Sequence, residues 1–444
     1  MLKLPKSMAS LCWASFVFGM QQFADLLSAE GATKAKAAAY TARNAIQEQF
    51  SADPVFFALD QIGDEAQRQT VDLLCDSFRL KPLNPRWVGR TWGRFVAGVV
   101  DSASALTPAE NLEATWQGLR NTLAVIRFVN QASTTLNLPP GEVRLLGAVD
   151  RAYALGGDYA ALWLVEGLGE EYADRNWAVA APVRGLLNRG TAAQLPEKCL
   201  LMLHAGMGIS FARRMLRPLT PYTCDSEVAG ALRRFIGLVH DNARPGYDGP
   251  ALESLGLVTR SWYPQMTPLI DRHLWMISRE ALEYFWHGVG RATYFNPRYL
   301  IPGASAFKAI VREAPHQLAR LNGTAGAAWA FTLVNIRQPE ILLNLLKKEG
   351  TTLGADDAFA CGVTSTVMMS LDTLPANDYA LEFCRFQPKS ADADLVARWD
   401  RMVHTPCRHA MEHYFPLLKN RGRLGEIFRY QNLERLAASL EGQH

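Results

Sequence analysis

The chain lacks the features that mark several common protein classes. It has only seven cysteines in 444 residues, an odd number at wide spacing with no C-x-x-C pair, which argues against a disulfide framework and favours a reducing, cytoplasmic setting. The formal net charge is only +3, so no nucleic-acid partner is expected. Alternating strand-like runs bounded by hairpin turns are scarce, and their absence argues against a β-rich fold.

Long hydrophobic runs are also missing. The apolar stretch at residues 8–20, which follows two lysines, resembles the start of a secretory signal but is too short to cross a bilayer. Its helical periodicity continues towards residue 27. We therefore expect residues 8–27 to form a helix that packs on the body of the protein, with a membrane-surface anchor or a cleaved signal as the alternatives.

The familiar catalytic motifs are absent as well. The chain contains no G-x-S-x-G elbow, Walker loop or EF-hand loop. Since active sites are also assembled from scattered residues, this absence leaves open whether the protein is an enzyme.

What the chain does have is a glycine motif that returns about every forty residues. Clear copies are Glu166-Gly167-Leu168-Gly169, His204-Ala205-Gly206-Met207-Gly208 and His287-Gly288-Val289-Gly290, with weaker ones at Glu253-Ser254-Leu255-Gly256, Thr324-Ala325-Gly326 and Cys361-Gly362. Glycine inside a helix costs about 0.8–1 kcal/mol relative to alanine. A costly residue at a fixed interval indicates a repeated packing need, which close contact between helix backbones would meet.

This pattern predicts an all-α protein in which a helical-repeat, solenoid-like array follows an N-terminal helical region. The break at Leu138-Pro139-Pro140-Gly141 places the boundary between residues 1–135 and residues 142–444. The G-x-G copies do not follow predicted strands, so they are not dinucleotide-binding fingerprints.

Two of the glycine blocks carry a family resemblance. Residues 203–213 and 285–295 resemble the recurring G-x-G-x-A blocks of an uncharacterised bacterial domain family encoded beside enediyne polyketide synthase genes. The resemblance covers residues 150–375 and supplies no catalytic residues. It implies a bacterial protein connected with natural-product or lipid-like metabolism.

The glycine blocks also contain the first set of candidate site residues. If the glycines and the aromatic side chains around them line a groove, that groove would hold an apolar small molecule or a partner helix. On this hypothesis Glu283, His287 and Arg291, one helical turn apart, are placed to orient a polar group or to do acid–base work. The ligand-binding candidates are His204, Gly206, Gly208, Glu283, Trp286, His287, Gly288, Gly290, Arg291 and Trp329.

A second set is a histidine cluster near the C-terminus. His404, Cys407, His409 and His413 have the residue types and spacing of ligands to zinc or heme iron, and Glu412 completes an H-x-x-E-H pattern as a general base. The alternative is that these side chains lie on a solvent-exposed helix and bind no metal.

Three functions therefore remain open. The first is a non-catalytic binding or accessory protein for an apolar ligand or a partner protein. The second is a metal- or heme-dependent enzyme that uses the residues from His404 to His413. The third is a membrane-peripheral scaffold attached through residues 8–27.

Overall fold

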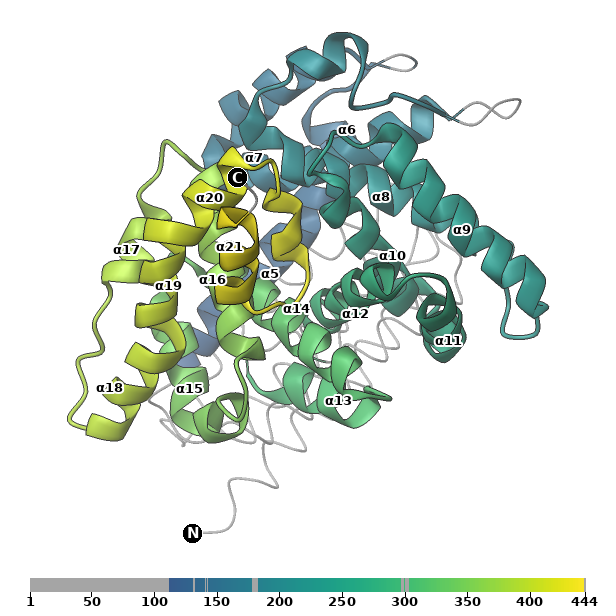
Figure 1. The fold of residues 1–444 in the computed structure, drawn as a ribbon. Coiled ribbons are helices and arrows are strands. Elements are labelled where there is room, and N and C mark those ends of the chain that lie inside the picture. The colour runs from purple at the N-terminus through teal and green to yellow at the C-terminus, as the bar shows by residue number, and fades with distance from the viewer. Residues whose placement is uncertain are drawn as a thin grey trace, which may run out of the picture. The chain divides into compact units, whose positions relative to one another are not determined.

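The computed structural model describes residues 112–442, except for residues 131, 140, 142, 178–182, 297, 298 and 300–302. Within these ranges the regular elements are helices, and there is no β-strand (Figure 1). The predicted all-α fold class is confirmed. The expected helix at residues 8–27 lies outside the described residues. Among the described helices, none is both long enough and apolar enough to cross a bilayer.

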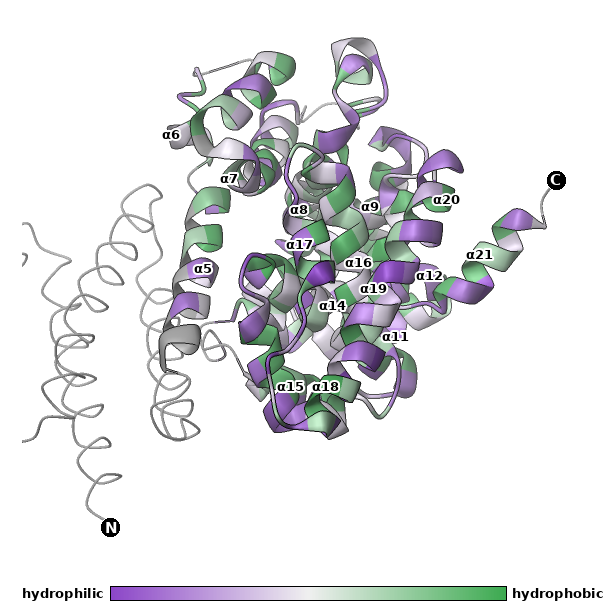
Figure 2. Cartoon of the chain, turned by 90° about the vertical axis from the view of Figure 1, so that its left-hand side faces the viewer, coloured by the Kyte–Doolittle hydropathy of each residue, from purple (hydrophilic) through white to green (hydrophobic). Residues whose placement is uncertain are grey.

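Six helices form a central row. They are α7 (Leu145–Arg175), α8 (Leu200–Leu216), α10 (Asp248–Trp262), α12 (Arg279–Tyr294), α14 (Gln317–Asn335) and α16 (Ala358–Thr373). Each packs along the next one named, and together they contribute most of the buried apolar side chains. Hydrophobic residues accordingly gather on central helices such as α14 and α16 (Figure 2).

The other helices connect and cover the row. Between its members lie α9 (Asp225–Asn242), α11 (Thr267–Ile277), α13 (Ser305–Glu313) and α15 (Pro339–Leu353). Before it come α5 (Leu112–Asn130) and α6 (Ala132–Thr135), and after it come α17 (Tyr379–Arg385), α18 (Ala393–Trp399), α19 (Thr405–His409), α20 (Phe415–Asn420) and α21 (Leu433–Glu441). The predicted domain boundary falls between α6 and α7, and α5 packs on α7, α14 and α15.

The G-x-G motif is a two-sided helix contact. In α8, Gly206 lies against the backbone of α7 and Gly208 against Ala251 of α10. In α12, Gly288 lies against the backbone of α10 and Gly290 against Gly323 of α14. Residues two apart point about 200° apart around a helix. The first glycine therefore contacts the preceding helix of the row, and the second contacts the following one. This is the packing role that the sequence pattern predicted.

The solenoid-like architecture is not confirmed. Repeats in a solenoid contact only their neighbours, whereas α7 also reaches the far part of the row. The Tyr159 hydroxyl of α7 donates to the backbone carbonyls of Leu333 and Val334 at 3.2 and 3.0 Å, and Arg291 of α12 pairs with Glu166 of α7. These contacts bring the middle of α7 against the C-terminal ends of α12 and α14.

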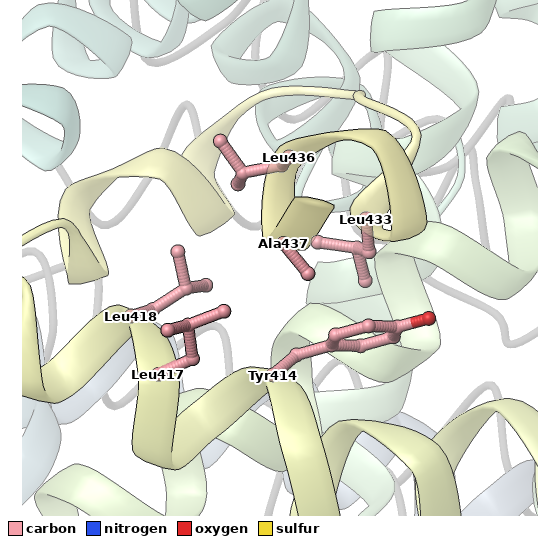
Figure 3. A pocket seen from close by; sticks show the side chains of 6 residues that line it. All are labelled: Tyr414, Leu417, Leu418, Leu433, Leu436 and Ala437. Atoms are coloured by element: carbon pink, nitrogen blue, oxygen red, sulfur yellow. The ribbon is translucent and has the colours of Figure 1, made fainter. Parts of the chain in front are cut away.

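The C-terminal part contains a strap of irregular chain. After α20, residues 421–432 include one short helix, η7 (Leu424–Phe428), whose backbone is held by a hydrogen bond from Gly425 N–H to the carbonyl of Gly246 at 2.9 Å. The strap then leads into α21. The cleft between α20 and α21 is lined by Tyr414, Leu417, Leu418, Leu433, Leu436 and Ala437 (Figure 3). It is closed to a water-sized molecule, so it is a helix contact rather than a binding site.

Candidate functional site: a surface cavity above a buried Glu–His–Arg cluster

A cavity of about 680 Å³ opens between α11, α12, α14 and the strap, a volume within the range of small-molecule sites. Its walls combine aromatic, aliphatic, cationic and amide side chains. The lining residues are Trp275, Arg279, Glu283, His316, Gln317, Leu318, Leu321, Asn322, Arg429, Tyr430 and Gln431.

One wall of the cavity carries an unpaired cation. The guanidinium of Arg279, the first residue of α12, lies 3.7 Å from the centroid of the Trp275 ring. It forms no ion pair with any carboxylate among the described residues. His316 lies beside the same tryptophan, with ring centroids 4.7 Å apart. Its two ring nitrogens are engaged, Nε2 with Asp271 at 3.0 Å and Nδ1 as acceptor from Ala319 N–H at 3.0 Å.

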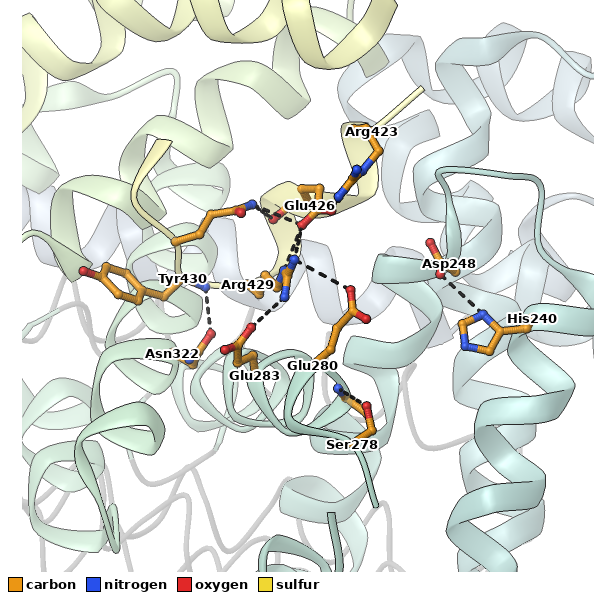
Figure 4. Close-up of polar contacts among 12 residues, drawn as sticks. His240, Asp248, Ser278, Glu280, Glu283, Asn322, Arg423, Glu426, Arg429 and Tyr430 are labelled. Carbon is orange, nitrogen blue, oxygen red and sulfur yellow. Dashed lines mark hydrogen bonds and ion pairs between the residues drawn. The ribbon is translucent and has the colours of Figure 1, made fainter. Parts of the chain in front are cut away.

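The opposite wall is an ion-pair network on the strap. Arg429 contacts Glu283 at 2.7 Å, Glu280 at 3.6 Å and Glu426 at 2.5 Å (Figure 4). Burial raises the pKa of Glu283, although the charge of Arg429 opposes the shift. Asn322 of α14 accepts a hydrogen bond from Tyr430 N–H at 2.7 Å. These contacts tie the strap to α12 and α14 and neutralise the charge of Arg429.

Beneath the cavity lies a buried charge cluster contributed by three helices. His287 Nδ1 of α12 is 2.9 Å from the Glu253 carboxylate of α10. Arg291, one turn further along α12, pairs with the other oxygen of Glu253 at 3.0 Å and with Glu166 of α7. All four side chains are at most 3% exposed. Buried charges of this kind persist only when they are paired.

The pairing sets the charge states in the cluster. Burial alone would raise the pKa of Glu253, but the charge of Arg291 and the hydrogen bond from His287 hold that pKa below its ordinary value. For Glu166, burial outweighs the attraction of Arg291, and its pKa is raised. The two carboxylates raise the pKa of Arg291 above its ordinary value in spite of burial. Glu253 and Arg291 are thus the fixed ion pair of the cluster.

Several polar atoms of this interior have no hydrogen-bond partner among the described residues. They are His287 Nε2, Arg291 Nε and Trp329 Nε1. The Arg291 guanidinium lies 5.0 Å from the Trp329 ring centroid, and the His287 ring lies 6.2 Å from it. Buried polar groups are nearly always hydrogen-bonded, and exceptions cluster at functional sites or bound molecules.

Phe428 packs on this cluster and is the chain neighbour of a cavity residue. Phe428 is fully buried, and its ring centroid lies 6.3 Å from that of His287 and 5.5 Å from that of Trp329. The next residue, Arg429, lines the cavity. Glu283, also in the cavity wall, is one turn before His287 on α12. The two sites are therefore adjacent.

The predicted ligand-binding residues divide into three groups. Glu283 lines the cavity, and His287, Arg291 and Trp329 form the cluster below it. Trp286 instead donates to Asp271 at 2.6 Å. His204 is far along the row in α8, where Nδ1 donates to Leu200 O at 2.6 Å and Nε2 accepts from Arg244 N–H at 3.0 Å.

The glycines among these candidates take part in helix contacts. The backbone of a neighbouring helix occupies the space in front of Gly206, Gly208, Gly288 and Gly290. These four positions do not line the cavity. Their role is to let α7, α8, α10, α12 and α14 approach closely enough for Glu166, Glu253 and Arg291 to meet.

The histidine cluster is dispersed over a distorted helix. Two π-helical turns, η5 (Asp400–His404) and η6 (Ala410–Tyr414), interrupt it just before Pro406 and Pro416. Proline lacks an N–H and clashes with the carbonyl four residues back, and a wider turn relieves both problems.

The predicted metal ligands do not converge on one point. His404 binds Asp400 at 2.9 Å, while His409 and His413 are exposed with ring centroids 6.3 Å apart. Cys407 is buried against Cys384, and burial raises the pKa of its thiol, which disfavours the thiolate that binds metals. Over the described part of the chain, no group of three or more His, Cys, Asp or Glu is arranged to hold a metal ion.

The sequence interpretation missed the partner of His287. The sequence predicted that Glu283, His287 and Arg291 act together on one helix face. In the structure Glu283 pairs with Arg429 in the cavity wall, and the carboxylate that contacts His287 belongs to Glu253. A signal for Glu253 was present. Three of the motif copies have a polar side chain three residues before their last glycine. These pairs are Glu166 and Gly169, Glu253 and Gly256, and His287 and Gly290. Their equivalent positions in the repeat place them in one interior.

No family model, curated protein or solved structure matches this chain. The resemblance to the enediyne-linked family stays a prediction, and the functional argument rests on the geometry of the cavity and the cluster.

Proposed function

We propose that this protein binds a small molecule with a flat apolar body and one negative charge in the cavity between α11, α12, α14 and the strap. The apolar body would lie between Trp275, Leu318, Leu321 and Tyr430. The negative group would meet Arg279. This is the binding function expected from the sequence, with the site moved from the glycine faces to the cavity.

The observation that carries the proposal is the unpaired guanidinium of Arg279. The other lining arginine, Arg429, is paired with three carboxylates. Among the described residues, Arg279 has no carboxylate at ion-pair distance, and it lies next to the exposed ring of Trp275. The N-terminal end of α12, where Arg279 lies, adds the positive end of the helix dipole. The family resemblance suggests that the ligand belongs to lipid-like or natural-product metabolism.

A pair of fluorescent probes tests the proposal. We expect the anionic 8-anilinonaphthalene-1-sulfonate to bind one site per chain more tightly than the uncharged N-phenyl-1-naphthylamine. Arg279→Ala removes the charged contact, so the affinity for the anionic probe should fall about tenfold, or about 1.4 kcal/mol, with little change for the uncharged probe. Trp275→Ala should weaken the binding of both probes.

Arg272→Ala is the matched control. Arg272 is exposed on α11, pairs with Asp225 and does not line the cavity. Its replacement should leave both affinities unchanged. Equal affinities for the two probes in the wild-type protein, or equal losses in the Arg272 and Arg279 variants, would contradict the proposal.

A further inference from the structure

The buried histidine is arranged as a proton acceptor. Glu253, held ionised by Arg291, can only accept a hydrogen bond. The hydrogen between Glu253 and His287 therefore belongs to Nδ1, which fixes the tautomer and the orientation of the ring. In the neutral form of the ring Nε2 carries the lone pair, and this nitrogen is buried with no hydrogen-bond partner among the described residues. A carboxylate that orients an imidazole in this way is the arrangement used by general bases.

Two hydrogen-bond donors accompany that lone pair. The terminal nitrogens of Arg291 bind Glu166 and Glu253, whereas its Nε has no partner among the described residues. The indole N–H of Trp329 is also unpaired. Neither group can act as an acceptor. The acceptor is His287 Nε2, and the donors are the Nε–H of Arg291 and the indole N–H of Trp329. This set suits a ligand hydroxyl that loses its proton to the acceptor and is then stabilised as an oxyanion by the donors.

The route that we infer from the cavity into this interior passes the ring of Phe428. This ring packs on His287 and Trp329 from the irregular strap, and its neighbour Arg429 forms part of the cavity wall. A ligand in the cavity reaches His287 when this one side chain moves aside. The strap is held to the body by the Gly425 backbone, the ion pairs of Arg429 and the hydrogen bonds of Tyr430 to Asn322 and Asp357, so the inferred movement is that of the Phe428 ring and not of the strap.

We propose that His287 accepts a proton from an acidic hydroxyl, phenolic or enolic, of a ligand bound in the cavity. The O–H bond breaks, an N–H bond forms at His287 Nε2, and the electron pair stays on the ligand oxygen. The Nε–H of Arg291 and the indole N–H of Trp329 then stabilise the oxyanion, as donors in an oxyanion hole do. The imidazolium is stabilised by Glu253. This step rests on the proposed binding function and narrows the ligand class to aromatic or conjugated hydroxyl compounds.

4-Nitrophenol tests the proposal, because its anion and its neutral form differ in colour. At a pH about two units below the point at which the free probe ionises, the fraction of anion should be about tenfold larger for the bound probe than for the free probe. His287→Gln should still bind the probe but remove this excess of anion. His409→Gln, which changes an exposed histidine outside the site, should behave like the wild-type protein.

A second measurement guards against a misfolded variant. In wild-type protein with ¹⁵N-labelled imidazoles, one of the nine histidines should change from neutral to imidazolium when 4-nitrophenol is added. The absence of that change would overturn the proposal.

The variants also separate this inference from the proposed function. If Arg279→Ala removes the excess of anion and His287→Gln retains it, the cavity binds anions but His287 accepts no proton. If neither the sulfonate probe nor 4-nitrophenol binds, the proposed function itself fails.

Discussion

At the scale of single residues, the same side-chain type has opposite roles in two copies of the motif. His204 and His287 both precede a glycine pair. Both nitrogens of His204 are satisfied by backbone groups, and its ring stacks on Tyr247 with centroids 5.5 Å apart. His287 has a carboxylate on one nitrogen and no partner on the other among the described residues. His204 is therefore structural, whereas His287 keeps one ring nitrogen for the proposed proton transfer.

His204 gives a pH dependence of stability. Burial lowers the pKa of His204 to about 4 from an ordinary value of 6.5. Since the unfolded chain binds the proton more readily, the stabilising contribution is complete above about pH 6.5 and is lost as the pH falls towards 4. We expect the free energy of unfolding to fall by about 3 kcal/mol over this window from this group alone.

Urea denaturation at about pH 7 and about pH 4 measures the effect. In His204→Gln the loss of stability on acidification should be smaller than in the wild-type protein by about that amount. Identical losses in the two proteins would show that His204 is not held neutral by burial.

At the scale of the helices, the sequence pattern predicted well what lies along one helix. The spacing of Glu283, His287 and Arg291 correctly placed them on α12, and the repeated glycines correctly indicated close helix contacts. The pattern failed where a partner comes from another helix. Helical periodicity carries no information about which helix faces His287, and Arg279 becomes a cavity residue only because α11 and α14 pack beside it.

The glycine contacts predict a strong effect of a single methyl group. In Gly288→Ala the new methyl would collide with the backbone of Glu253 and Leu257, so α10 and α12 must move apart. We expect the free energy of unfolding to fall by about 2 kcal/mol or more. Gly237→Ala on α9 is the matched control, because open space surrounds Gly237. There the better helix propensity of alanine should raise stability by about 0.5–1 kcal/mol. If both variants gained stability, the packing role of the motif would be refuted.

At the scale of the whole described body, Arg291 links helices that are distant in the chain. Its pairs with Glu166 and Glu253 connect α7, α10 and α12. Composition and repeats predicted the all-α class, but they could not predict this connection, because it depends on α7 lying next to α12 and α14. The position of the strap could not be predicted either. Residues 421–432 carry no motif, although Phe428 of the strap packs on His287 and Trp329.

Removal of the central cation should therefore destabilise the protein strongly. In Arg291→Met two buried carboxylates lose their counter-charge, and we expect the free energy of unfolding to fall by about 3–5 kcal/mol. Arg312→Met, which changes an exposed arginine on α13, should alter it by less than about 0.5 kcal/mol. Chemical denaturation of both variants measures the difference. A loss below about 1 kcal/mol in Arg291→Met would show that the cluster is solvated and not a closed interior.

The most direct test of the central claim is to locate a bound anion by ¹⁹F NMR of protein that carries 5-fluorotryptophan. The Trp275 resonance is identified by its absence from the spectrum of Trp275→Phe. Addition of 8-anilinonaphthalene-1-sulfonate should shift this resonance in the wild-type protein, and in Arg279→Ala the same shift should need about tenfold more probe. If the probe binds and the Trp275 resonance stays in place, the ligand site lies elsewhere and the account is wrong.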